Sequence, residues 1–224
     1  MCSSITLLAA GSLRPALTPL ITHFTRISGI HVQVEYGPAG LLRERIEAGE
    51  PCALFASANR EHPQRLLAEH NAISTHTFCW NQLGLVTNLS GEWLDLLRNP
   101  TLRIGTSTPG CDPSGDYTWA FFDKMDALET GLGQQLHERA IPLVGGRDSV
   151  KIPQGELAST WVLRQGLADL FIGYAHYAKT LRALPDVRYV AIPTEYNIQC
   201  EYQLALLEAS KDALALVEFI LGNG

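Results

Sequence analysis

The chain has 224 residues, of which 46% are hydrophobic and 18% charged, and its formal net charge at pH 7 is −6. This length is enough for one large or two small folded units, each with its own core. The negative charge balance leaves no clustered basic surface, which argues against a nucleic-acid partner. No apolar run reaches the roughly 20 residues of a membrane-spanning helix, so the sequence predicts none.

The start of the chain and its cysteines bear on the compartment. Met1-Cys2-Ser3-Ser4 leads directly into the first predicted strand, without a signal peptide. Two interpretations remain, an intracellular protein or an exported one from which a signal peptide was removed. The cysteines form no Cys-x-x-Cys pair, which argues against a structural zinc site, and their odd number leaves at least one thiol free. They are Cys2, Cys52, Cys79, Cys111 and Cys200.

Strand and helix patterns alternate along the chain. Short apolar or alternating runs predict strands, and apolar residues at helical spacing predict helices. The predicted strands are residues 5–10, 32–36, 53–56, 102–105, 170–174 and 187–192, with longer extended runs over 78–87 and 201–207. The predicted helices are residues 13–27, 41–48, 61–70, 93–97, 117–128, 156–165 and 211–221, and a glycine-rich loop is expected over 141–148. This alternation favours parallel sheets covered by helices on both faces.

Two such series, joined by the two extended runs, predict two lobes. We expect lobe I to contain residues 1–82 and 203–224 and lobe II residues 83–202, with crossover strands near 79–88 and 199–207. The carboxyl ends of strands and the amino ends of helices would then meet in a cleft between the lobes, where α/β proteins usually bind ligands. Closure about the two crossovers would trap a ligand.

Four predicted helix starts lie beside small residues, where a ligand can approach the backbone closely. The first is at Ser12, whose hydroxyl could cap the helix while the next N–H groups have no intrahelical acceptor. The others lie near Ala39-Gly40, Asp112–Gly115 and Gln154–Glu156. Free donors at a helix start bind either water or an anion, and an ordinary helix cap is an alternative interpretation of Ser12.

Three stretches together resemble the ModA family of molybdate- and tungstate-binding proteins, which serve ABC transporters. They are Ala9–Leu13, Tyr36–Gly49 and Phe55–Ala58, and Ile172-Gly173-Tyr174 is similar to a later strand of the family. The resemblance extends over essentially the whole chain. It implies a two-lobed α/β fold of the type II periplasmic-binding-protein class, in which each lobe is a mainly parallel sheet flanked by helices.

The resemblance also implies a function. The protein would have no enzymatic activity and no cofactor, and would act as a monomer. It would capture a small oxyanion, molybdate or tungstate, and deliver it to the membrane subunits of an ABC transporter. Its location would be periplasmic or extracellular, after removal of a signal peptide that this sequence does not carry.

Carried over position by position, the resemblance implies an oxyanion cage of hydroxyls and backbone N–H groups. Ser12 is similar to the first hydroxyl ligand, and Tyr174 to the tyrosine whose hydroxyl points into the cleft. The other implied oxyanion-binding residues are Ala39, Gly40, Ser114, Gly115 and Glu156. Neutral donors and helix starts can stabilise a dianion at short range, and a rigid cage selects by size as well as charge.

Several positions depart from the family pattern. Ala39 stands where the family typically has a second serine, and Ala53 where it has an aspartate. The stretch Asp112–Gly115 is more similar to the archaeal tungstate/molybdate branch, in which an aspartate and a glutamate complete an octahedral metal centre. Asp112 and Glu156 are the candidates for those two ligands, if the coordination is octahedral. The alternative is a turn residue at Asp112 and a helix-start charge at Glu156.

Other functions remain open at this point. The same fold could bind another oxyanion such as sulfate, or could form the effector-sensing domain of a cytoplasmic regulator. An export signal ahead of the first strand would favour transport, and an upstream helix-turn-helix segment would favour regulation. An enzyme is the weakest hypothesis, because the sequence contains no evident nucleophile–base pair or metal cluster.

Overall fold

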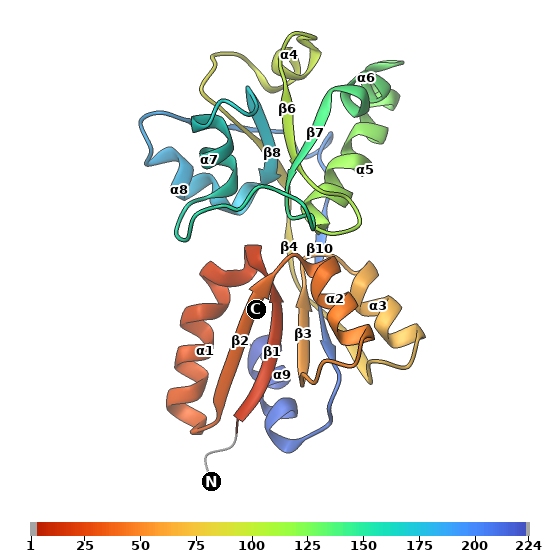
Figure 1. Ribbon diagram of the computed structural model, residues 1–224, viewed down its shortest axis with the longest axis vertical. Helices are drawn as coiled ribbons and strands as arrows, with labels where there is room; N and C mark the ends of the chain where they lie inside the picture. Colours follow the sequence, from red (N-terminus) through yellow and green to blue (C-terminus); the bar gives the residue numbers. More distant parts are fainter. Residues whose placement is uncertain (1–3, 223–224) are drawn as a thin grey trace. The chain divides into compact units, whose positions relative to one another are not determined.

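The computed structural model describes residues 4–222, which form two compact units. Unit 1 consists of the chain up to Trp80 together with the chain from Glu201 onward, and unit 2 is Asn81–Cys200. Each unit has one five-stranded sheet flanked by helices (Figure 1). Cys2 lies outside the described residues; Cys52, Cys79, Cys111 and Cys200 are free thiols. Among the helices of residues 4–222, none has the length and apolar content of a bilayer-crossing segment.

The sheet of unit 1 has the strand order β2-β1-β3-β10-β4. Its strands are β1 (Ser4–Ala10), β2 (His31–Gly37), β3 (Leu54–Ser57), β4 (Ser74–Asn81) and β10 (Cys200–Leu206). β1 runs parallel to both β2 and β3, and β10 runs antiparallel to β3. The last four residues of β1 are buried, as expected of a central strand covered on both faces.

The helices of unit 1 cover this sheet. They are α1 (Arg14–Ser28), α2 (Ala39–Glu47), α3 (Glu61–Ala68) and α9 (Lys211–Gly222). α1 buries Leu17, Ile21 and Phe24, and its Phe24 ring lies 5.2 Å from that of Phe219 on α9. Ile27, which the sequence pattern places on the same apolar face, is 58% exposed in the last turn of the helix.

The sheet of unit 2 has the strand order β7-β6-β8-β5-β9. Its strands are β5 (Leu83–Thr87), β6 (Ile104–Ser107), β7 (Ala140–Val144), β8 (Leu170–Tyr174) and β9 (Arg188–Ala191). β6 is parallel to β7 and β8, but β5 is antiparallel to both β8 and β9. This sheet is therefore mixed rather than mainly parallel.

The helices of unit 2 are α4 (Trp93–Arg98), α5 (Pro113–Leu128), α6 (Leu132–Arg139), α7 (Ala158–Arg164) and α8 (Ala178–Arg182). α5 begins four residues before the predicted start, because Asp112 caps it and Pro113 suits the first helical position. The expected loop over 141–148 is wrong in its first half, which is strand β7. The extended run over 78–87 is two strands, β4 and β5, which belong to different sheets.

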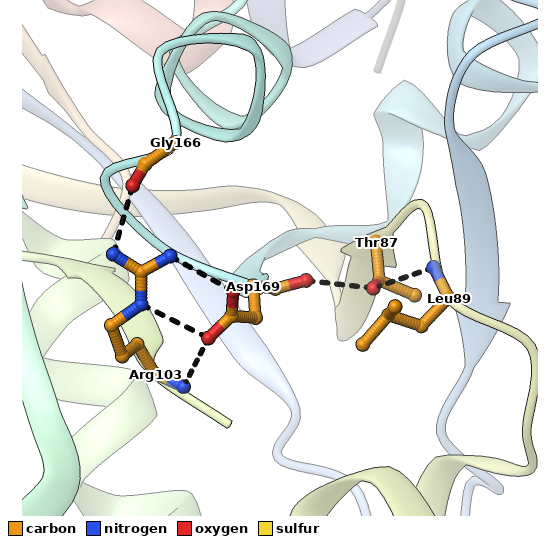
Figure 2. Close-up of polar contacts among 5 residues, drawn as sticks. All are labelled: Thr87, Leu89, Arg103, Gly166 and Asp169. Atoms are coloured by element: carbon orange, nitrogen blue, oxygen red, sulfur yellow. Dashed lines mark hydrogen bonds and ion pairs between the residues drawn. The ribbon is translucent and has the colours of Figure 1, made fainter. Parts of the chain in front are cut away.

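An arginine–aspartate network joins the amino ends of β6 and β8 (Figure 2). Arg103 donates through Nε and Nη2 to the two carboxylate oxygens of Asp169, at 3.0 and 2.9 Å, and through Nη1 to the Gly166 carbonyl at 2.8 Å. The Asp169 carbonyl accepts the Thr87 hydroxyl at 2.8 Å, and the hydroxyl oxygen accepts the Leu89 N–H at 3.1 Å. The network thus fixes the turn before β8 to two neighbouring segments.

We expect Asp169→Asn to lower the free energy of unfolding by about 1 kcal/mol at pH 7, because the ion pair is partly exposed. The hydrogen bond from the Arg103 side chain holds the pKa of Asp169 below its ordinary value. The stabilisation is therefore present above the ordinary pKa of aspartate and is lost as the pH falls through the folded-state value. Urea denaturation at pH 7 and at about pH 2 measures this difference. An equal loss at both pH values would contradict it.

Candidate functional site

In unit 1 the structure brings together three of the predicted residues, Ser12, Ala39 and Gly40, which we call the unit 1 cluster. β1 and β2 end side by side, with Ala10 opposite Gly37, and each chain then turns into a helical segment. Ser12 and Ala39 each come two residues after this pair, so they share the carboxyl edge of the sheet. This is the edge at which α/β sheets bind ligands.

The Ser12 hydroxyl does not cap α1, so that prediction is wrong. Residues Gly11–Leu13 form a separate 3-10 turn between β1 and α1, the N-cap of α1 is Leu13, and no side chain bonds to it there. The extra turn moves Ser12 back from the first N–H groups of α1. Its Oγ lies 3.4 Å from the Tyr202 hydroxyl oxygen on β10. A serine hydroxyl has one donor and two acceptor positions, so it can also donate to an anion.

The start of α2 offers backbone donors. The first hydrogen bond of this helix runs from the Leu42 N–H to the Pro38 carbonyl, at 3.0 Å. The N–H groups of Ala39, Gly40 and Leu41 precede that bond, so the helix itself provides them with no acceptor. No side chain caps this helix, and its first turn contains no acidic residue. An anion could therefore approach donors that no internal carboxylate neutralises.

In unit 2 the predicted residues Ser114, Gly115 and Tyr174 form what we call the unit 2 cluster. Ser114 and Gly115 lie in the first turn of α5 and are buried. Tyr174 is the last residue of β8, 6% exposed, at the edge where the parallel strands β6 and β8 end. Its ring centroid lies 5.9 Å from that of His176.

Asp112 accepts hydrogen bonds from the backbone N–H groups at the start of α5. Its Oδ1 accepts the Ser114 N–H at 3.0 Å, and its carbonyl accepts the Gly115 N–H at 2.8 Å. Both backbone groups predicted to bind an oxyanion here thus already have an acceptor within the chain. The hydroxyls of Ser114 and Tyr174 are the other polar groups that the cluster can offer a ligand.

The Asp112 carboxyl is tightly enclosed. Burial, together with the charge of Asp116, raises its pKa to about 6, against the opposing effect of the hydrogen bonds from Ser114 and Ser107. A Cβ added at Gly145 would lie only 2.5 Å from Asp112 Oδ2. The glycine at this position, with a φ of 76°, thus leaves room for the carboxyl group.

The helix predicted to start near Glu156 starts two residues later, because α7 begins at Ala158 and Leu157 is its N-cap. The Glu156 N–H donates to the Pro153 carbonyl at 3.1 Å, and its exposed carboxylate lies 3.3 Å from Arg164 Nη1. Within residues 4–222, no group of three or more His, Cys, Asp and Glu side chains is arranged to hold a metal ion. Asp112 and Glu156 each have an internal partner, and their role as metal ligands stays a prediction.

Further polar residues, which were not among the predicted site residues, lie at the carboxyl end of β3. Ser57 donates to the Asn59 side chain at 2.9 Å, and both residues are buried. Gln203 on β10 lies opposite Ser57 and donates to the Thr77 hydroxyl at 3.2 Å. Its buried Oε1 has no hydrogen-bond partner among the described residues. The signal in the sequence was polar residues directly after an apolar strand, which is weak because loops also begin this way.

Comparison with known sequences identifies relatives over nearly the whole chain. The model of a family described as bacterial extracellular solute-binding protein matches residues 5–223. An uncharacterized protein, PM1146 of Pasteurella multocida (strain Pm70), is 44% identical over 221 residues, which cover 96% of this chain and 91% of that protein. The molybdate-binding protein ModA of Escherichia coli (strain K12) is 26% identical over 223 residues, which cover 93% of this chain and 79% of that protein.

Solved structures share the fold. The periplasmic molybdate-binding protein of Azotobacter vinelandii has a TM-score of 0.73 and 20% identity, with 96% of this chain and 90% of that chain covered. The sulfate-binding protein SubI of Mycobacterium tuberculosis H37Rv has a TM-score of 0.76 and 22% identity, with 98% of this chain and 82% of that chain covered. These matches confirm the predicted fold class, and the ModA match confirms the resemblance. The chain belongs to the family of bacterial extracellular solute-binding proteins.

Proposed function

We propose that this protein captures molybdate or tungstate outside the cytoplasm and delivers it to the membrane subunits of an ABC transporter. Its membership of a solute-binding family supports binding rather than catalysis. The observation that carries the proposal is the unit 1 cluster, where a serine hydroxyl and a helix start free of carboxylates share one edge of the sheet. The relative named as a molybdate-binding protein gives the ligand class.

The proposed ligand is held by neutral donors. The N–H groups of Ala39 and Gly40 and the Ser12 hydroxyl suit the oxygens of a tetrahedral dianion, because helix starts carry partial positive charge. The hydroxyls of Ser114 and Tyr174 are further proposed donors. Asp112 is proposed to remain the cap of α5, since a carboxylate facing a dianion would be repelled by it.

Sulfate is the second candidate ligand, because the fold is also that of a sulfate-binding protein. The test is the thermal midpoint of the ligand-free protein, with molybdate, tungstate, sulfate and phosphate added separately at millimolar concentration. A ligand at about 1,000 times its Kd stabilises the folded state by roughly 4 kcal/mol, a large upward shift. A rise with molybdate and tungstate alone supports the proposal, a rise with sulfate as well indicates a general oxyanion carrier, and no rise contradicts both.

We expect Ser12→Ala to weaken oxyanion binding about ten-fold and to leave the thermal midpoint of the ligand-free protein unchanged. The reason is that Ser12 caps no helix, so its hydroxyl is expected to contribute to the affinity for the ligand rather than to the stability of α1. Calorimetric titration measures the affinity. Ser28→Ala is the matched control: this serine, at the other end of α1, donates to the Phe24 carbonyl, so its loss is expected to lower stability and spare affinity. Unchanged affinity in Ser12→Ala would exclude Ser12 as a ligand.

A further inference from the structure

An arginine is fixed beside the unit 1 cluster. Arg14 is the first residue of α1, and its guanidinium carbon lies 4.4 Å from the centroid of the Tyr36 ring. Tyr36 is the penultimate residue of β2, so this stacked pair lies at the same edge of the sheet as Ser12 and the start of α2. The Tyr36 hydroxyl oxygen lies 3.3 Å from Thr18 Oγ1, which holds the ring against α1. The guanidinium is thus positioned by the fold although it is exposed.

Nothing within residues 4–222 balances the charge of Arg14. Other arginines of the chain form ion pairs, such as Arg45 with Glu35 and Arg103 with Asp169. Arg14 forms none among the described residues, and the first turn of α1 contains no acidic side chain. A cation at a helix start is also disfavoured by the helix dipole. Within the described residues the Tyr36 ring holds the guanidinium but brings no counter-charge, and an anion that arrives from solution would supply one.

The two clusters differ in charge. At the start of α5 the chain supplies its own carboxylate, Asp112, whereas Arg14 adds a positive charge beside the unit 1 cluster. The whole protein carries a net charge of −6, which repels a dianion at long range. A local positive charge would offset that repulsion where the ligand arrives.

We propose that Arg14 is the residue that attracts the oxyanion electrostatically to the unit 1 cluster, and that Tyr36 keeps the guanidinium there. The inference rests on the proposed function and deepens it. Ser12 and Arg14 are two positions apart on consecutive helical turns, and residues so spaced point in different directions. Arg14 therefore acts through its charge at a distance, outside the set of groups that bond to the ligand.

The experiment measures the Kd of the full-length chain for molybdate, and separately for sulfate, by calorimetry at ionic strengths from about 10 to about 500 mM. Arg14→Gln is expected to raise Kd about three- to ten-fold at the lowest ionic strength and less than about two-fold at the highest, where salt screens the charge. Arg14→Lys keeps the charge, and an ammonium can also lie over the face of the Tyr36 ring, so this variant is expected to stay within about two-fold of the natural protein throughout.

Arg26→Gln is the matched control, because it removes the same charge from the opposite end of α1, where Arg26 contacts His23. Its Kd is expected to change by less than about two-fold at every ionic strength. If the natural protein binds neither anion, the proposed function fails together with this inference. The natural protein could instead bind an anion while Arg14→Gln has the same Kd at low salt, or while Arg14→Lys has a Kd as high as that of Arg14→Gln. Either result would overturn only the role of Arg14.

Discussion

Gly115→Ala is expected to lower the free energy of unfolding by about 1 to 2 kcal/mol. An added Cβ would lie 2.6 Å from Pro109 N and Thr108 C and 2.7 Å from Ser107 O, all of them backbone atoms that have no rotamer to change. The start of α5 would have to move away from the loop that follows β6. Forced repacking of this kind costs about 1 to 3 kcal/mol, and the better helix propensity of alanine offsets only about 1 of it.

Urea denaturation of the full chain measures the loss, and Gly173→Ala is its control. Gly173 lies in the same unit, and a Cβ there would first meet a side-chain atom of Phe171 at 3.4 Å, an ordinary contact. We expect that control to change stability by less than about 0.5 kcal/mol. Because Asp112 and Ser114 move with this helix start, Gly115→Ala should also weaken oxyanion binding. Stability equal to that of the natural protein would mean that α5 is not held against this loop.

Opposite pH trends are expected in the two units. In unit 1, burial together with the charges of the nearby Arg43 and Arg65 lowers the pKa of His62 from 6.5 to about 4. The unfolded chain then binds the proton more tightly than the folded one. The contribution of His62 to the stability of unit 1 is therefore complete above about pH 6.5 and is lost, by about 3 kcal/mol, as the pH falls through 4.

In unit 2 the sign is reversed, because burial raises the pKa of Asp112 from 3.8 to about 6. Here the folded chain binds the proton more tightly than the unfolded one. The contribution is complete below about pH 3.8 and is lost as the pH rises through 6, again by about 3 kcal/mol. Between about pH 4 and pH 7, His62 thus makes acid weaken unit 1, whereas Asp112 makes neutral pH weaken unit 2.

Hydrogen exchange corrected for intrinsic rates measures each unit separately between about pH 4 and pH 7. His62→Gln is expected to flatten the pH dependence of unit 1 alone. Asp112→Asn is expected to flatten that of unit 2 alone, since an asparagine oxygen can still cap α5. A single pH trend shared by both units, or one unaffected by these substitutions, would refute the assignment of the two groups.

Hydrophobic periodicity was enough to locate most of the fold. The apolar run before Gly11 is β1, and the helical spacing that follows it is α1, which buries Leu17 and Ile21. Periodicity does not predict α6, because few of its apolar side chains are buried, chiefly those of Leu132 and Leu136. The break between β4 and β5 has no local signal, because both halves are extended and only pairing with different sheets separates them.

The candidate residues could be chosen from the sequence, but their surroundings could not. Whether Ser12 caps a helix depends on one 3-10 turn, and no pattern in the residues Gly11–Leu13 predicts that turn. The direction of the Asp112 carboxylate depends on space left by Gly145, more than thirty residues away in the chain. The residues around Glu156 have the pattern of a helix start. In the structure Glu156 precedes α7, and its carboxylate forms an ion pair with Arg164 at the end of that helix.

The interrupted chain of unit 1 has a consequence for biosynthesis. Unit 2 is one continuous segment, Asn81–Cys200, and everything it needs has been translated once that segment is complete. Unit 1 must wait, because β10 lies between β3 and β4 in its sheet and comes after unit 2 in the chain. During synthesis unit 2 can therefore fold first, while β3 and β4 expose unpaired edges until the ribosome releases the final segment. A truncated chain that ends at Cys200 would contain the whole of unit 2 and would lack nearly all of β10.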